Sequence, residues 1–190
     1  MSIIYMSKLL GHNLNKQHRI TWVDLIKPLM DMAKICGFSV FYLGSDESTI
    51  SKGISVLKQL YPGIVFEYRN GFFNPEKKSP ENTQVLQQIN LFKPNILLVG
   101  MGMLRQEKWI LENFNHLDCN AIMTCGAAIE YIAGKVNTPP RWMGRTGLEW
   151  AYRFFENPKR FWCRYLVEPW FVLGLFMRDI CKKYILRKPL

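Results

Sequence analysis

Four short apolar segments alternate along the chain with segments of helical periodicity, and each apolar segment ends at or beside a turn. The apolar segments predict strands over residues 38–44, 64–69, 95–100 and 120–126. Buried strands that alternate with amphipathic helices are typical of a parallel sheet covered on both faces. We therefore predict an α/β fold, with a Rossmann-like parallel sheet and helices on both faces.

A glycine lies at or just after the end of each predicted strand, at positions Gly44, Gly71, Gly100, Gly102 and Gly126. Ligands of open parallel sheets bind beyond the carboxyl ends of the strands. Any one of these glycines could simply make the turn. Together they favour a backbone that approaches a ligand closely at this edge of the sheet.

The segment GMGMLRQE, residues 100–107, excludes two common nucleotide-binding motifs. Arg105 stands where a dinucleotide fingerprint needs its third glycine, and no Gly-Lys-Ser/Thr follows. A glycine-rich strand exit followed by Gln106 and Glu107 suits a phosphate or a sugar hydroxyl, held by backbone N–H groups and the amide side chain. The alternative is a capped helix whose two polar side chains are solvated.

The sequence contains no convincing pair of nucleophile and base. Cys125 precedes Gly126 without a histidine nearby, which favours a buried structural thiol. Glu130, one helical turn further on, is a candidate for binding a ligand hydroxyl. The five cysteines form no CxxC and the three histidines have no metal-ligand spacing, so we predict reduced thiols, no metal site and no cofactor.

The last 50 residues combine aromatic and basic side chains. The net charge of the chain is +10, and residues 141–190 hold eleven Lys and Arg against four Asp and Glu. Three interpretations compete: nucleic-acid binding through stacking and phosphate contacts, a core helix whose arginines snorkel, and an element at a membrane surface. The spacing of four tryptophans favours an interface. They are Trp142, Trp150, Trp162 and Trp170.

The helix-breaking segment 137–140 marks the predicted boundary between an α/β core, residues 1–140, and a helical appendage, residues 141–190. Further helix divisions are expected at Asn157-Pro158 and Glu168-Pro169. The N-terminus lacks a signal-peptide pattern, and the apolar run 169–177 is far shorter than the ~20 residues that span a bilayer.

Three segments, VGMGMLRQEKWI, TCGAAIEYIAGKV and TPPRWMGRTGLEWAYRFFENPKRFWCRYL, resemble the WecB/TagA/CpsF family of bacterial glycosyltransferases. The resemblance runs from about Ser2 to Phe176. It implies an inverting, metal-independent hexosyltransferase of polysaccharide or teichoic acid biosynthesis. Such an enzyme moves an N-acetylmannosamine-type sugar from a UDP-sugar donor to a polyprenyl-diphosphate-linked acceptor. It also implies a peripheral position on the inner face of the cytoplasmic membrane, and it leaves homo-oligomeric assembly open.

The resemblance also assigns site residues. The donor site would comprise Arg19, Gly44, Gly71, Phe72, Gly100, Gly102, Gln106, Gly126 and Glu130, with Glu130 in place of an Asp in most members. Leu104 stands where the family usually has Pro. The arginines expected to meet the diphosphates, for which a planar guanidinium is well suited, are Arg141, Arg145, Arg153, Arg160 and Arg164.

One departure concerns the proposed general base of the family, the Asp of an Asp-Gly pair. That pair would fall immediately before Met1, so we expect either an upstream start or a fragment. Without the base the chain would be poorly active, because general-base catalysis typically contributes ~10²–10⁴ in rate. Two alternatives therefore stand beside the transferase: an impaired fragment that only binds nucleotide or membrane, and a nucleic-acid-binding protein.

Overall fold

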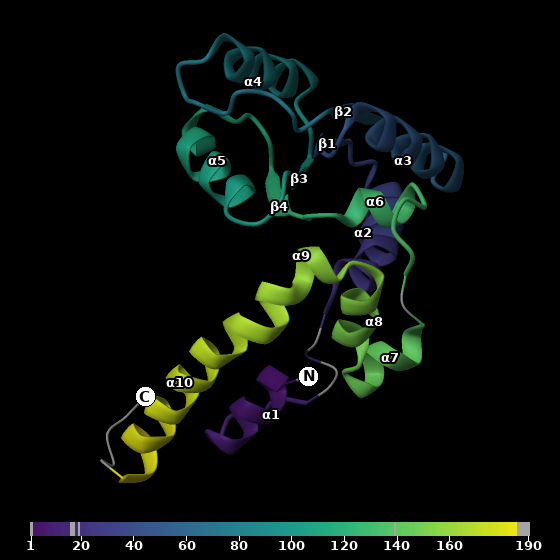
Figure 1. The fold of residues 1–190 in the computed structure, drawn as a ribbon. Coiled ribbons are helices and arrows are strands. Elements are labelled where there is room, and N and C mark those ends of the chain that lie inside the picture. The colour runs from purple at the N-terminus through teal and green to yellow at the C-terminus, as the bar shows by residue number, and fades with distance from the viewer. Residues whose placement is uncertain (1, 16–17, 19, 139, 186–190) are drawn as a thin grey trace. The chain divides into compact units, whose positions relative to one another are not determined.

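The computed structural model describes residues 2–15, 18, 20–138 and 140–185, and describes only the backbone of residues 2, 3, 141, 144, 145, 160 and 164. The chain divides into two compact units (Figure 1). One, called here the α/β unit, spans Thr21–Asn137. The other, the appendage unit, combines Met1–Ile20 with Thr138–Leu190. This grouping places the first 20 residues with the C-terminal helices, whereas the sequence-based division kept them with the core.

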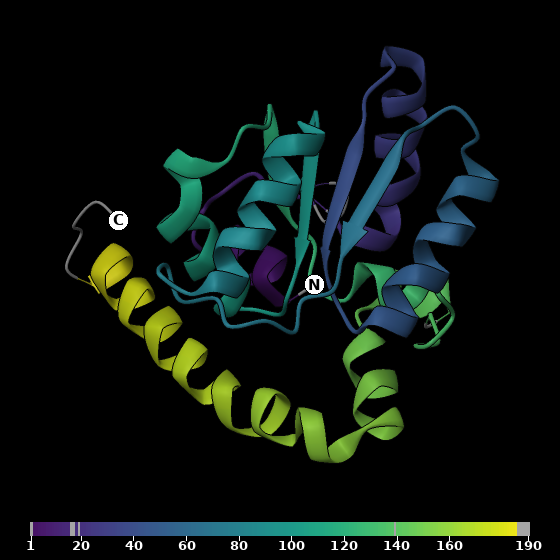
Figure 2. The same cartoon turned by 90° about the horizontal axis from the view of Figure 1, so that it is seen from above.

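Four parallel strands form the sheet of the α/β unit, in the order β2-β1-β3-β4 (Figure 2). They are β1 (Val40–Gly44), β2 (Phe66–Arg69), β3 (Ile96–Gly100) and β4 (Ala121–Thr124). Every residue of the two central strands, β1 and β3, is buried. The predicted parallel sheet is confirmed, and each observed strand is shorter than the predicted segment.

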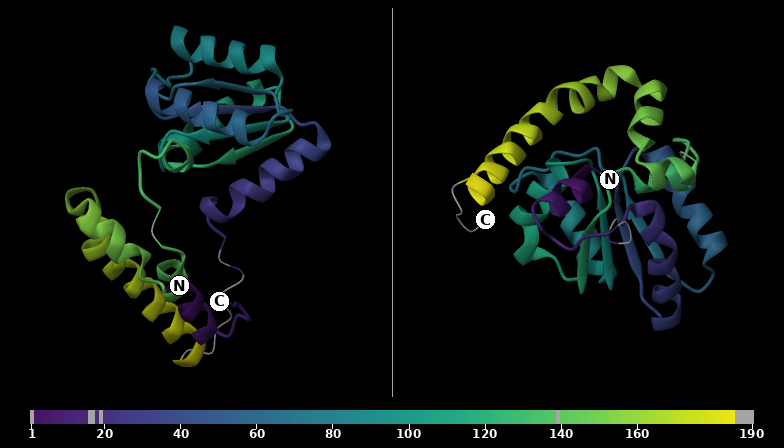
Figure 3. Two further views of the ribbon diagram at one scale, coloured as in Figure 1. Left: turned by 90° about the vertical axis from the view of Figure 1, so that its right-hand side faces the viewer. Right: turned by 90° about the horizontal axis from the view of Figure 1, so that it is seen from below.

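Helices cover both faces of this sheet, which confirms the predicted layers (Figure 3). One face packs against α2 (Trp22–Cys36), α3 (Glu47–Leu60) and α6 (Ala128–Ile132). The other face packs against α4 (Pro80–Phe92) and α5 (Arg105–Asn113), which the short 3-10 turn η2 (Phe114–His116) follows.

Local signals in the sequence set the ends of these helices. The Asp46 carboxylate accepts from the Thr49 N–H at 2.9 Å and caps α3, and the Ser79 hydroxyl accepts from the Asn82 N–H at 3.0 Å and caps α4. Gly37 ends α2 with φ +67°, a left-handed conformation that glycine adopts without strain. These caps satisfy backbone groups that the helices themselves leave unpaired.

The appendage unit is helical throughout its described elements. They are α1 (Ser2–Leu9), α7 (Arg141–Thr146), α8 (Glu149–Glu156), α9 (Pro158–Trp162), the π-helical turn η3 (Cys163–Val167), α10 (Glu168–Ile180) and the π-helical turn η4 (Cys181–Ile185). None of the described helices is long and apolar enough to span a membrane.

The predicted helix end at Glu168-Pro169 is wrong. The chain stays helical from α9 through η4, and the proline falls in the first turn of α10, directly after η3 (Figure 1). Proline has no N–H to donate to the carbonyl four residues earlier, and its ring crowds that carbonyl. A widened π turn before Pro169 accommodates both effects without ending the helix.

Candidate functional site

The carboxyl edge of the sheet brings together the glycine-containing strand exits that the sequence singled out. Gly44 is the register partner of Gly100, and the Ser45 N–H donates to the Gly100 carbonyl at 3.3 Å. The Gly71 N–H donates to the Ser45 carbonyl at 2.8 Å. The exits of β1, β2 and β3 are thus linked directly through their backbones.

Three of these glycines are required by the protein's own packing. A Cβ at Gly44 would lie 2.3 Å from the Gly100 carbonyl oxygen, and one at Gly71 would lie 2.9 Å from the Gly44 Cα. A Cβ at Gly100 would lie 2.6 Å from the Gly126 carbonyl oxygen. The close approach that was predicted toward a ligand is, at these three positions, an approach of backbone to backbone.

Gly102 and Gly126 differ from those three glycines. They have φ values of +90° and +51°, and an added Cβ at either would meet no atom within 4 Å. Their glycine character follows from backbone conformation, and the space beside each Cα is open. Among the five predicted glycines, these two are the ones beside which a ligand could lie against the backbone.

Gln106 lies at the start of α5 and is 5% exposed, so it is not a solvated surface residue. Its side-chain N–H donates to Glu107 Oε1 at 2.7 Å, and its carbonyl oxygen accepts from the Gly126 N–H at 3.3 Å. The amide donation lowers the pKa of Glu107, so Glu107 remains a carboxylate. Gln106 therefore ties α5 to the Gly126 turn.

Exposed apolar side chains lie in the loops at the same edge. Phe72 is 73% exposed, whereas its neighbour Phe73 is buried and packs edge-on against Trp109 at a centroid distance of 6.3 Å. Leu104 is exposed and has φ +70°. Proline cannot adopt that φ, so a proline in place of Leu104 would require a different turn.

A tyrosine that the sequence did not single out lies beneath this edge. Tyr42, in the middle of β1, is fully buried, and its hydroxyl accepts from the Ile129 N–H at 3.1 Å and from the Cys125 thiol at 3.0 Å. Burial raises the pKa of Cys125 to about 12, so this thiol is neutral and serves a structural role, as predicted. Glu130, the predicted carboxylate, is half-buried and follows Ile129 directly in α6.

An ion pair, also missed from the sequence, connects the segment after α6 with the start of α3. Lys135 Nζ lies 2.6 Å from Asp46 Oδ2 and 3.1 Å from Thr49 Oγ1. The Lys135 ammonium, aided by donors from Ser48 and Thr49, holds the pKa of Asp46 well below its usual range. No motif signals a contact between residues 89 positions apart.

Few of the predicted arginines can be placed. Arg19 lies outside the described residues, as do the side chains of Arg141, Arg145, Arg160 and Arg164. Arg153 is described, and its Nη2 lies 2.7 Å from Glu149 Oε1 one turn earlier in α8. Its predicted role toward a diphosphate stays a prediction.

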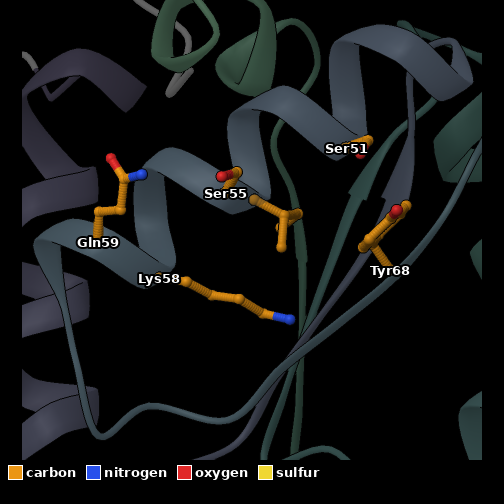
Figure 4. A pocket seen from close by; sticks show the side chains of 6 residues that line it. Ser51, Ser55, Lys58, Gln59 and Tyr68 are labelled. Atoms are coloured by element: carbon orange, nitrogen blue, oxygen red, sulfur yellow. The ribbon is translucent and has the colours of Figure 1, made fainter.

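Neither Gly102 nor Gly126 lines the two larger cavities described for the α/β unit. One, of about 420 Å³, is lined by Ser51, Ile54, Ser55, Lys58 and Gln59 of α3 and by Tyr68 of β2 (Figure 4). The other, of about 310 Å³, is lined by Pro75, Glu76, Lys77, Arg105, Lys108, Trp109 and Glu112. Within the described part of the chain, no cluster of three His, Cys, Asp or Glu could hold a metal ion.

Two comparisons with known proteins, one with family models and one with curated proteins, agree with each other. The model of the glycosyl transferase WecG/TagA/CpsF family matches residues 1–185. The similar curated proteins include the N-acetylglucosaminyldiphosphoundecaprenol N-acetyl-beta-D-mannosaminyltransferases of Staphylococcus aureus strains MW2 and NCTC 8325 / PS 47. Each is 31% identical over 143 residues, which cover 75% of this chain and 54% of the relative. The chain thus spans about half the length of the curated relatives it matches.

Proposed function

The chain belongs to the glycosyl transferase WecG/TagA/CpsF family, and on that basis we propose that it acts as a glycosyltransferase on a polyprenyl-diphosphate-linked acceptor. The sugar it transfers is of the N-acetylmannosamine type, and the donor is a UDP-sugar. The observation that supports this most strongly is the pair of open, positive-φ glycines at the carboxyl edge of the sheet, Gly102 and Gly126, in a chain that matches the family over residues 1–185.

The proposed donor site uses the α/β unit. Backbone groups beside Gly102 hold the diphosphate, which lies in the open space next to Gly126. The Glu130 carboxylate accepts from a ligand hydroxyl, and exposed Phe72 lies against the nucleobase. Gln106 acts indirectly, because both ends of its amide bind protein groups and orient the Gly126 turn.

The proposed transfer is a single displacement. The acceptor hydroxyl attacks the anomeric carbon of the donor, its proton passes to a general base, and the bond to the nucleotide diphosphate breaks with inversion. Negative charge then builds on the leaving diphosphate, where N–H groups and arginines stabilise it. The arginines proposed for this role are those of the appendage unit, and the proposed base is the Asp of the family's Asp-Gly pair.

The appendage unit supports a position at an anionic membrane surface. Its helices α8 and α10 contain no buried residue, and Trp162, Trp170, Phe171 and Met177 are exposed. The basic excess belongs to residues 141–190 as a whole, which hold eleven Lys and Arg against four Asp and Glu. Amphipathic helices rich in aromatic and basic residues bind at the headgroup level of anionic bilayers. We place the protein at the inner face of the cytoplasmic membrane, where lipid-linked acceptors would be used. A nucleic-acid-binding protein would instead prefer duplex or single strands to anionic vesicles, in a salt-dependent way.

The deciding experiment is a transfer assay. The gene product, with any residues encoded upstream of Met1, is incubated with UDP-N-acetylmannosamine and N-acetylglucosaminyl-diphospho-lipid, and products are identified by mass spectrometry. Glu130→Gln should lower kcat/KM about tenfold to a hundredfold, because a hydrogen bond to a charged group is lost. Glu112→Gln, on the exposed face of α5, is the matched control.

The outcomes separate the alternatives. Transfer that depends on Glu130 supports the proposal. Nucleotide binding without transfer by the complete gene product would favour the impaired fragment, and neither binding nor transfer would contradict the proposed function.

A further inference from the structure

We infer that Tyr42 is a positioning residue of the proposed donor site, whose hydroxyl fixes the first turn of α6 and thereby places the Gly126 turn and Glu130. The inference rests on the proposed function for the identity of the ligand. The contacts that support the positioning role all lie within the α/β unit.

The Tyr42 hydroxyl acts as the cap of a helix that lacks an ordinary one. The first N–H groups of a helix have no partner within it, and a Ser, Thr, Asp or Asn at the N-cap usually accepts from one of them. Ala127 occupies the N-cap of α6 and offers no side-chain acceptor. The Ile129 N–H, in the first turn, donates instead to the Tyr42 hydroxyl at 3.1 Å.

The same hydroxyl touches the exits of two strands. A Cβ built on Gly100, at the end of β3, would lie 2.8 Å from the Tyr42 hydroxyl oxygen and 3.1 Å from Cys125 Sγ. Cys125, just beyond β4, donates its thiol to that oxygen at 3.0 Å. One buried oxygen on β1 therefore lies against the β3 exit, the β4 exit and the start of α6.

Because α6 is short, the contact with the Tyr42 hydroxyl is important for the position of its first turn. The helix has five residues, so few internal hydrogen bonds hold it. Glu130 follows Ile129, and the backbone carbonyl of Glu130 accepts from the Lys135 N–H at 2.9 Å. If the hydroxyl is removed, the Ile129 N–H is buried without this acceptor, and the first turn is free to shift. Ordering that turn again on ligand binding lowers the apparent affinity.

The test compares Tyr42→Phe with a control that weakens the fold elsewhere. Tyr42→Phe removes one oxygen and keeps the ring. Val85→Ala shortens a fully buried side chain of α4 on the opposite face of the sheet. Both variants should melt at lower temperature than the parent chain. Only Tyr42→Phe should raise the Kd for UDP, measured by titration calorimetry on the 190-residue chain, by about fivefold to tenfold, the effect of one hydrogen bond. It should also speed amide exchange over residues 126–133.

Two results would overturn the inference. One is a Tyr42→Phe chain that binds UDP as the parent does while exchange over residues 126–133 is unchanged. The other is an equal loss of affinity in Val85→Ala, which would show that affinity follows overall stability. Failure of the parent chain itself to bind UDP would count against the proposed function. In that case unchanged exchange in Tyr42→Phe would reject the positioning role, and faster exchange would support it.

Discussion

The α/β unit and the appendage unit are both rich in large apolar side chains, yet only one of them buries these side chains extensively. Every residue of β1 and β3 is buried, and α2 to α6 each bury at least two residues. In the appendage unit α8 and α10 bury none, and Trp170 and Phe171 are each 72% exposed. Hydrophobic content alone therefore does not define a core. A core forms only where a second layer covers the apolar face.

Thiol reactivity should show the largest difference between the core of the α/β unit and the appendage unit, whereas Cys36 on the surface of the α/β unit is exposed and should react as the appendage thiols do. At pH 8 the Cys125 thiol, with a pKa of about 12, is ionised on the order of a thousandfold less than free cysteine, and it is also buried. Cys163 and Cys181 of the appendage unit are exposed. Iodoacetamide followed by peptide mass spectrometry should therefore label the two appendage thiols long before Cys125. Labelling of Cys125 at a similar rate in the folded chain would contradict the description of a closed core.

Two leucines, one from each unit, should differ in how much each contributes to the free energy of unfolding. Leu98 in β3 is 0% exposed and Leu166 in η3 is 54% exposed. Leu98→Ala should lower the free energy of unfolding by about 2–5 kcal/mol, because it leaves a cavity among packed side chains. Leu166→Ala should change it by less than about 0.5 kcal/mol. Chemical denaturation measures both, and equal losses would show that Leu166 is packed in solution.

Membrane binding should also differ between the two units. Trp170→Glu with Phe171→Glu should weaken binding to anionic phosphatidylglycerol vesicles on the order of a hundredfold, since burial of each aromatic at the interface is lost. Ile35→Glu with Leu91→Glu is the control, because these side chains are 86% and 88% exposed in the α/β unit. Cosedimentation should show no loss for the control. An equal loss in both double variants would remove the appendage unit as the membrane-binding element.

The sequence predicted the sheet because short, mainly apolar runs with glycine at or just after their ends alternate with helical segments, a pattern typical of parallel sheets. It misplaced the strand ends because side chains near them compete for backbone groups. The Ser39 N–H, which the prediction placed inside a strand, donates to the Asn95 side chain at 2.9 Å, and β1 begins one residue later. Such competition depends on a residue 56 positions away and has no local signal.

The grouping of the glycines at one edge of the sheet was predicted from the sequence, whereas the contacts that each glycine makes were not. Strand exits of a parallel sheet share one edge, so the glycines could be placed there without a structure. Gly44 and Gly100 are register partners, and their close backbone contact is the reason that both must be glycine. This register is a property of the assembled sheet. Tyr42 was missed for the same reason, since its partner Ile129 lies 87 residues further along the chain.

The smallest expected effect concerns the ion pair between Asp46 and Lys135, because both side chains are substantially exposed and water screens their attraction. Asp46→Asn keeps an efficient N-cap for α3 and removes only the charge. Because the pKa of Asp46 is lowered in the folded chain, its ionised form stabilises the fold above the unfolded-state pKa of ~3.9, and this contribution is lost as pH falls below that value. The melting temperature of Asp46→Asn should therefore lie slightly below that of the parent at pH 7 and converge with it in acid. A difference that persists in acid would mean that Asp46 stabilises the fold mainly through interactions that do not depend on its charge, so that the link between α3 and the segment after α6 owes little to the ion pair.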